Sequence, residues 1–176
     1  MTPIIRQVTD PSEAPLEDLA ALLIDSVHGG ASVGFLAPLA LPAAIGYWTD
    51  VVASLRGPVR LWIAEDDGRI VGSVQLALCE KPNGTHRAEV QKLLVHTAAR
   101  GRGVASRLMA AIDRFAVANG RTLLYLDTEA GSAAESVYRH LGWKKTGEIP
   151  NYATSPDGTP CATAIYYKLG AAPPSS

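Results

Sequence analysis

Residues 99–109 (ARGRGVASRLM) form a glycine- and arginine-rich stretch with the residue types of an anion site. The stretch joins an apolar, strand-like segment to an amphipathic, helix-like one. Free amides at the start of a helix, together with the helix dipole, attract a diphosphate. Glycines let the backbone approach such a ligand, and Arg100 and Arg102 add charged donors. We therefore predict a diphosphate cradle over residues 101–106; the alternative is a turn at the start of a helix whose arginines are solvated.

A second glycine-rich stretch, residues 27–36 (VHGGASVGFL), offers the same small residues and free amides. It follows a helix-like segment instead of a strand, has no arginine, and runs into Phe35 and Leu36. This context does not suit a phosphate. We expect a shaped loop here, and the alternative is a helix C-terminal cap followed by an ordinary surface loop.

The hydrophobic pattern predicts the elements that would position these stretches. Alternating or apolar runs predict strands at 3–8, 59–64, 70–78, 87–96, 123–127, 144–149 and 163–168, and helical spacing predicts helices at 16–27, 41–55, 104–118 and 133–141. This order indicates a mixed α/β domain with a βαβ crossover around the helix that follows the cradle. We expect a polar loop over 151–160, a single domain over 1–170 and a mobile tail over 171–176.

The composition restricts the class of protein. With 47% apolar and 19% charged residues among 176, the chain is typical of one globular domain. Its net charge of -1 argues against a surface for nucleic acid or an anionic membrane. The sequence shows no secretory signal, no run long enough to span a bilayer, and no metal-ligand spacing at Cys79, Cys161 or the scattered histidines. We therefore expect a cytoplasmic protein with two buried thiols and no metal site.

The spacing Arg-x-x-Gly-x-Ala at residues 100–105 resembles the pyrophosphate-binding motif of the GCN5-related N-acetyltransferases (GNAT). In that family the motif follows a strand and opens a helix. A later short helix carries a tyrosine and ends in glycine plus an aromatic residue, as residues 138–143 (YRHLGW) do. Further blocks, among them VHGGASVGF, RAEVQKLLV and LDTEAGSAAE, resemble the tabtoxin-resistance acetyltransferases of plant-associated pseudomonads.

This resemblance implies the GNAT fold, a mixed central sheet of about seven strands flanked by about four helices. It implies acetyl-CoA as acyl donor, no metal, and the amine of a small molecule as acceptor, either an amino-acid-like compound or a β-lactam toxin. Two alternatives stay open: a protein N-terminus or lysine as acceptor, and a non-catalytic acyl-CoA-binding domain. The family also admits a homodimer, and we expect neither a nucleic-acid nor a membrane partner.

The resemblance further implies which residues bind the cofactor. The strand backbone at Leu93, Leu94 and Val95 would pair with the pantetheine arm as an added strand does. Many family members carry an asparagine seven residues before the tyrosine; Gly131 stands there in this chain, and Ser132 is the candidate substitute. The residues expected to hold the diphosphate are Arg100, Gly101, Arg102, Gly103, Val104, Ala105 and Ser106.

Three side chains are implied in the chemistry itself. Tyr138 is the expected general acid that protonates the leaving thiolate, and the alternative is a tyrosine packed on an apolar face. Glu89, which interrupts the apolar pattern of its strand, and Asp127, at the end of the neighbouring strand, are the candidate bases. One of them could instead bind the ammonium of the acceptor, and the plain alternative for both is a solvated or capping carboxylate.

Three further residues are implied on the acceptor side. Within the family, the connection between the first two helices lies beside the acceptor, which makes Ser32 and Phe35 candidate contacts. Glu129, two residues beyond Asp127, is a third candidate for the base and a candidate contact on the acceptor side.

Overall fold

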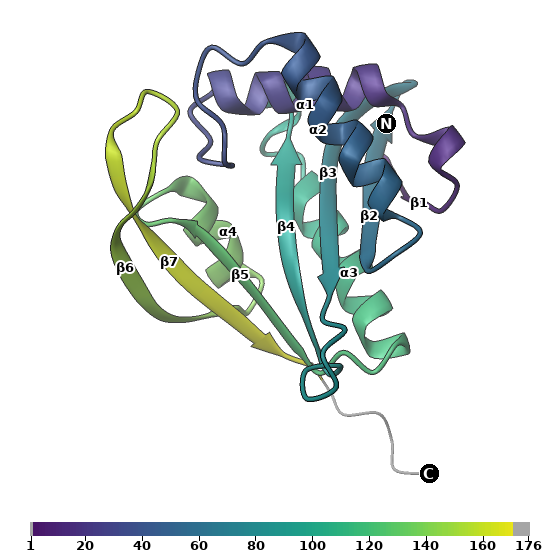
Figure 1. The fold of residues 1–176 in the computed structure, drawn as a ribbon, viewed down its shortest axis with the longest axis vertical. Helices are drawn as coiled ribbons and strands as arrows, with labels where there is room; N and C mark the ends of the chain where they lie inside the picture. Colours follow the sequence, from purple (N-terminus) through teal and green to yellow (C-terminus); the bar gives the residue numbers. More distant parts are fainter. Residues whose placement is uncertain (1, 171–176) are drawn as a thin grey trace.

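The computed structural model describes residues 2–170, which form a seven-stranded sheet with two helices on each face (Figure 1). The strands are β1 Ile4–Val8, β2 Val59–Asp66, β3 Arg69–Leu78, β4 Arg87–Val95, β5 Leu123–Glu129, β6 Lys144–Thr154 and β7 Pro160–Leu169. The helices are α1 Leu16–His28, α2 Leu41–Ser54, α3 Val104–Ala118 and α4 Ala133–His140, with short 3-10 turns η1 Pro11–Glu13 and η2 Thr97–Ala99. The strand order is β1-β2-β3-β4-β5-β7-β6. The predicted mixed sheet and its four helices are confirmed; the tail expected over 171–176 lies outside the described residues.

The hairpin of β6 and β7 differs from the prediction of a polar loop over 151–160. Both strands extend into that segment, so the connection is a turn of residues 155–159. The turn closes through the Ser155 N–H, which donates to the carbonyl of Thr159 (2.8 Å). Nearly all of β6 is exposed to solvent. The polar composition there reflects an exposed hairpin, because a strand without a buried face needs no apolar alternation.

Two apolar cores lie on opposite faces of the sheet. Alternation along β2 shows the division: Leu61 and Ile63 pack with α1 and α2, whereas Trp62 and Ala64 pack with α3. The core under α1 and α2 draws its strand residues from β1 to β4. The core under α3 and α4 extends across β5 and β7 as well. The α1–α2 face of β5 and β7 therefore lies outside both cores.

Strands β4 and β5 separate in the middle of the sheet. They pair in parallel over only three positions, from Arg87 opposite Leu123 to Glu89 opposite Tyr125. Beyond these, β4 continues beside β3 and β5 continues beside β7, and the two diverge (Figure 1). Among the described residues, the edge of β4 over 90–95 that faces β5 has no strand partner. The parallel pair confirms the predicted βαβ crossover.

A bulge interrupts β4 just after this point. Its pairing with β3 shifts register between Gln91 and Leu94. Lys92, within the shift, has a φ of 49°, in the left-handed region that non-glycine residues rarely adopt. A bulge adds an unpaired residue and reverses the faces of the side chains after it. Lys92 accordingly faces α2, where its Nζ lies 5.7 Å from the ring centroid of Tyr47.

Gly72 of β3 lets α3 pack closely against the sheet. A Cβ at this position would lie 2.8 Å from Cγ1 of Val104 and 3.1 Å from Cδ1 of Leu108. It would also lie 3.0 Å from the carbonyl oxygen of Leu94. Because that backbone cannot move without disturbing β4, the first turns of α3 depend on a glycine here.

Gly72→Ala is expected to lower the free energy of unfolding by about 1–3 kcal/mol, as overpacking of a dense core does. Gly46→Ala in α2 is the matched control, because its Cβ would meet no atom within 4 Å. Removing a helical glycine at that open position should raise stability by about 0.5–1 kcal/mol. Urea denaturation measures both changes. Equal midpoints for wild type and Gly72→Ala would contradict the close contact.

Candidate active site

The predicted anion cradle lies where β4 ends and α3 begins. Gly101 and Gly103 have φ of 73° and 74°, in the left-handed region. Gly103 is the N-cap residue, and no described side chain caps the helix at this position. The first amides of α3 are therefore left for another acceptor, and the helix dipole favours a negative one.

The two arginines of the cradle have partners of their own. Arg100 Nε donates to the carbonyl of Val95 over 3.4 Å. Arg102 forms an ion pair with Asp66 at the end of β2, with 2.7 Å between Nη2 and Oδ2. Sequence spacing alone places both arginines beside the anion, but the fold ties Arg102 to the β2–β3 turn.

Helix α1 holds the segment that leads into the cradle. Asp25 accepts two hydrogen bonds from Thr97, one from its N–H (2.8 Å) and one from its Oγ1 (2.7 Å). His96 Nδ1 accepts from the Ala98 N–H at 3.2 Å. Sequence reasoning missed Asp25, since a carboxylate on a helix gives no local sign of a partner 72 residues away.

The two candidate bases, Glu89 and Asp127, lie on one face of the sheet at the β4–β5 separation. Glu89 stands in register with Tyr125, and Asp127 follows two residues later on the same face. Burial raises the pKa of Glu89, and the charge of Asp127 raises it further, whereas Gln91 and Lys92 act in the opposite direction. Glu89 is therefore a stronger base than an exposed glutamate, while Asp127 is exposed.

Lys92 belongs to the same group of charges and was missed by sequence reasoning. Burial lowers the pKa of its ammonium, and the charges of Asp127 and Glu89 act in the opposite direction. Strict alternation from Glu89 places Lys92 on the α3 face, away from the carboxylates. The bulge reverses that placement, and an isolated lysine in an apolar run gives no sign of a bulge.

Tyr138, the candidate general acid, lies buried in α4. Its ring centroid is 6.1 Å from that of Trp143 and 6.0 Å from that of Tyr166. Burial, reinforced by the charge of Asp127, raises the pKa of the phenol well above its ordinary 10.0. The hydroxyl therefore keeps its proton at neutral pH and can donate it. Tyr138 is thus packed among apolar side chains and is also able to donate a proton, so the two alternatives for this residue do not exclude each other.

Glu135 fixes the start of α4 beneath Tyr138. The residue is 3% exposed, and its carboxylate accepts hydrogen bonds from the N–H of Gly131 (2.8 Å), from Lys145 Nζ (3.2 Å) and from the Tyr166 hydroxyl. Burial disfavours its charge, but these donors outweigh burial and lower the pKa of Glu135. The Gly131 amide is thus engaged within the chain. Ser132 Oγ is buried without a hydrogen-bond partner among the described residues.

The α1–α2 loop, residues 29–40, meets the β6–β7 hairpin on the other side of the site. The Ala37 N–H donates to the Pro156 carbonyl over 2.8 Å, and Ser32 Oγ donates to the Thr154 carbonyl over 3.3 Å. The structure therefore ties Ser32 to β6.

Two more residues support this acceptor side. Glu129 Oε1 accepts from Ser155 Oγ at 3.0 Å, which joins β5 to the hairpin turn. The Phe35 ring packs edge-on against Tyr47 of α2, with centroids 5.3 Å apart. Phe35 thereby adjoins the ring over which Lys92 lies. The candidate acceptor residues are thus gathered along one side of the β4–β5 separation.

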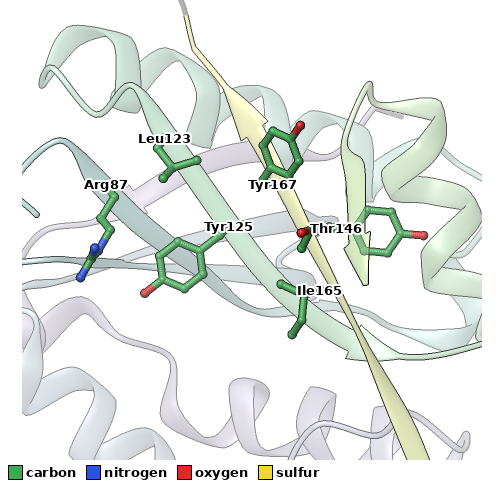
Figure 2. A pocket seen from close by; sticks show the side chains of 7 residues that line it. Arg87, Leu123, Tyr125, Thr146, Ile165 and Tyr167 are labelled. Carbon is green, nitrogen blue, oxygen red and sulfur yellow. The ribbon is translucent and has the colours of Figure 1, made fainter. Parts of the chain in front are cut away.

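A concave surface of about 420 Å³ lies on the uncovered face beside Glu89. Figure 2 shows the side chains that line it, which include Arg87 of β4 and Thr146 of β6. Aromatic and aliphatic side chains form most of its wall. The labelled ones are Leu123, Tyr125, Ile165 and Tyr167.

Residues 2–170 contain no group of three or more histidine, cysteine, aspartate or glutamate side chains placed to hold a metal ion. Cys79 and Cys161 are free thiols, and both are half-buried instead of fully buried as expected, because each lies near a strand end open to solvent. Of the helices described, none is long and apolar enough to cross a membrane.

Comparison with known proteins gives one family. The acetyltransferase (GNAT) domain model matches residues 57–145, from just before β2 to the first residues of β6. The rat protein N-acetyltransferase 8 is 35% identical over 89 residues, covering 49% of this chain and 40% of that protein. The chain thus spans about two fifths of the length of this relative.

Two further proteins match over most of their length. The IAA acetyltransferase of Azospirillum brasilense is 28% identical over 150 residues, which cover 85% of this chain and 92% of that protein. The phosphinothricin acetyltransferase of Sinorhizobium meliloti, solved in complex with acetyl-CoA, superposes with a TM-score of 0.77 at 16% identity. That superposition covers all of this chain and 93% of the other, and it shows a common fold.

Glu135→Gln is expected to lower the free energy of unfolding by about 1–3 kcal/mol at neutral pH, because it removes a hydrogen-bonded buried carboxylate. The folded-state pKa of Glu135 lies below its ordinary 4.5, so its contribution is complete above that value and is lost as the pH falls through the lower one. Denaturation at a series of pH values should show the wild type and variant converging in acid.

Glu148→Gln is the matched control, because Glu148 is exposed and contacts the same lysine, Lys145. Its effect should stay within about 0.5 kcal/mol at any pH. A difference between wild type and Glu135→Gln that grows in acid would contradict the assignment.

Proposed function

This chain belongs to the GNAT acetyltransferase family, whose domain model matches half of it, and we propose that it moves the acetyl group of acetyl-CoA onto the amine of a small molecule. The observation that carries the proposal is the separation of β4 and β5. It leaves an unpaired strand edge that runs from Glu89 toward the uncapped start of α3. A buried tyrosine, Tyr138, packs beside the same strands.

The residues fit acetyl-CoA in two respects. An extended pantetheine arm needs backbone partners, and the open edge of β4 at Leu93, Leu94 and Val95 offers them. A diphosphate needs free amides and a positive dipole, and residues 101–106 at the start of α3 offer both. When bound, acetyl-CoA supplies the acetyl group as a thioester.

Glu89 is the proposed general base, acting through water, while Asp127 holds the ammonium of the acceptor. An amine with a pKa of about 10 is mostly protonated at neutral pH, so a base must take a proton before the nitrogen attacks. The raised pKa of Glu89 suits that role. The nitrogen then bonds to the acetyl carbon, the carbon–sulfur bond breaks, and Tyr138 gives its phenolic proton to the departing sulfur. The proton that the nitrogen loses as the amide forms passes through water to restore the Tyr138 phenol, and Glu89 releases its own proton to solvent.

A small acceptor suits the acceptor side better than a folded protein does. The α1–α2 loop is bonded to the β6–β7 hairpin across this side, which narrows the approach. An open, shallow surface lined by aromatic and aliphatic side chains, among them Tyr125 opposite Glu89, adjoins this side. The resemblance to tabtoxin-resistance enzymes supports an amino-acid-like acceptor, and the near-neutral net charge of -1 favours a small-molecule acceptor over a protein.

Acetyl-CoA is expected to raise the melting temperature, and thiol release from it should require an added amine. Tyr138→Phe should lower kcat by about 10²-fold or more, since the general acid is lost, while the thermal stabilisation by acetyl-CoA stays. Tyr152→Phe, at an exposed position on β6, is the matched control and should keep full activity. A wild-type protein without any thermal response to acetyl-CoA would refute the function, and full turnover by Tyr138→Phe would refute the acid.

The pH dependence of kcat/KM should distinguish the two carboxylates. A base works only when ionised, so the rate should rise with pH through the pKa of Glu89, which lies above the ordinary 4.5. Glu89→Gln should lower kcat by about 10²-fold or more and abolish that rise. Asp127→Asn should move the rise to lower pH, because the charge of Asp127 raises the pKa of Glu89, and should raise the KM for the amine. An unchanged profile in Glu89→Gln would assign the base to another group.

A further inference from the structure

We propose that the ammonium of Lys92 binds an anionic group, a carboxylate, on the acceptor, so that the acceptor is a zwitterionic amino acid or a close analogue. This inference rests on the proposed acetyl transfer and narrows its substrate class. It concerns a residue whose side chain the general chemistry of acetyl transfer does not use.

The bulge in β4 places Lys92 where an acceptor would approach. With φ at 49°, Lys92 leaves the strand alternation and faces α2. Its Nζ lies 5.7 Å from the Tyr47 ring centroid and 3.7 Å from the point where a Cβ on Gly34 would stand. The ammonium thus sits between the separation of β4 and β5, helix α2, and the α1–α2 loop.

The Lys92 side chain is half-buried, and its ammonium has no counter-ion in contact. None of the ion pairs among residues 2–170 includes Lys92. The aromatic face of Tyr47 offers only a weak interaction in comparison with an anion. A half-buried cation without an anionic partner in contact is partly desolvated at a cost, and a bound carboxylate would supply that partner through charge-assisted hydrogen bonds.

The neighbouring charges complete the case for a zwitterion. Glu89 and Asp127 act electrostatically on Lys92, so two negative groups and one positive group share this part of the site. An α-amino acid carries its ammonium and its carboxylate on the same carbon atom. Binding with its ammonium at the two carboxylates and its own carboxylate at Lys92 would match both charges and turn the nitrogen toward Glu89.

The test compares amino acids with their neutral amides. L-alanine, L-methionine and L-lysine, each beside its α-carboxamide, are acceptors in a thiol-release assay with wild type, Lys92→Met, Lys92→Gln and Lys92→Arg. The wild-type preference in kcat/KM for acid over amide should fall by about 10-fold or more in Lys92→Met and Lys92→Gln. Lys92→Arg should retain part of it, since it keeps the charge. Converting the carboxylate to an amide also lowers the pKa of the amine. The ratio of kcat/KM for the acid to kcat/KM for the amide is therefore compared between wild type and each variant.

Lys144→Met on the exposed strand β6 is the matched control and should leave the ratio unchanged. Thermal stabilisation by acetyl-CoA verifies that each variant is folded. Calorimetry of the same acids and amides in the presence of CoA gives the corresponding ratio of dissociation constants, without turnover. Wild type that binds acetyl-CoA but acetylates no amine would refute the proposed function alone. An acid-to-amide ratio unaltered in Lys92→Met and Lys92→Gln, in turnover or in binding, would overturn the role of Lys92.

Discussion

The separation of β4 from β5 after three paired positions is the constraint on which the rest of the structure depends. A continuous sheet would satisfy the backbone of both strands internally and leave no place for an extended ligand. Instead, each strand keeps its other neighbour, so the sheet remains intact while one edge of β4 stays open. The side chains at the point of separation, Glu89 and Asp127, are thereby drawn into one electrostatic group.

Packing on both sides of the sheet maintains that geometry. Gly72 admits the first turns of α3 against β3, which places the free helix amides at the end of β4. Glu135 anchors α4 through its hydrogen bonds to Gly131 and Tyr166. The Tyr138 phenol is therefore positioned by α4, whereas the carboxylates of Glu89 and Asp127 are positioned by the strands. Asp25 joins α1 to the segment before the cradle. Gly72, Glu135 and Asp25 each contact an element distant in sequence, and each contact fixes how a helix or loop lies against the sheet.

The helices and strands could be predicted from the sequence because local hydrophobic spacing determines them, and the predicted cradle coincides with the start of one of these helices. The helix over 104–118 and the crossover around it follow from apolar periodicity and two glycines. Contacts between residues far apart in the sequence could not be predicted from it. Examples are the ion pair of Arg102 with Asp66 and the hydrogen bond of Ser32 to Thr154. The bulge at Lys92 is a shift in the pairing of β4 with β3, so the sequence of β4 alone predicts a strand with regular alternation. The sequence predicts a loop over 151–160, and not the far end of the β6–β7 hairpin, because β6 has no buried residue and so needs no apolar alternation.

The open edge of β4 has a consequence for the chain in a crowded solution. Exposed strand edges are templates on which other chains add strands, and proteins commonly guard them with charges, prolines or covering loops. Here the edge faces inward, with β5 diverging across from it (Figure 1). A thin, extended molecule can reach it, whereas a strand that already belongs to another sheet would meet β5 first. The same divergence that admits a ligand thus shields the open edge of β4 from strands of other sheets.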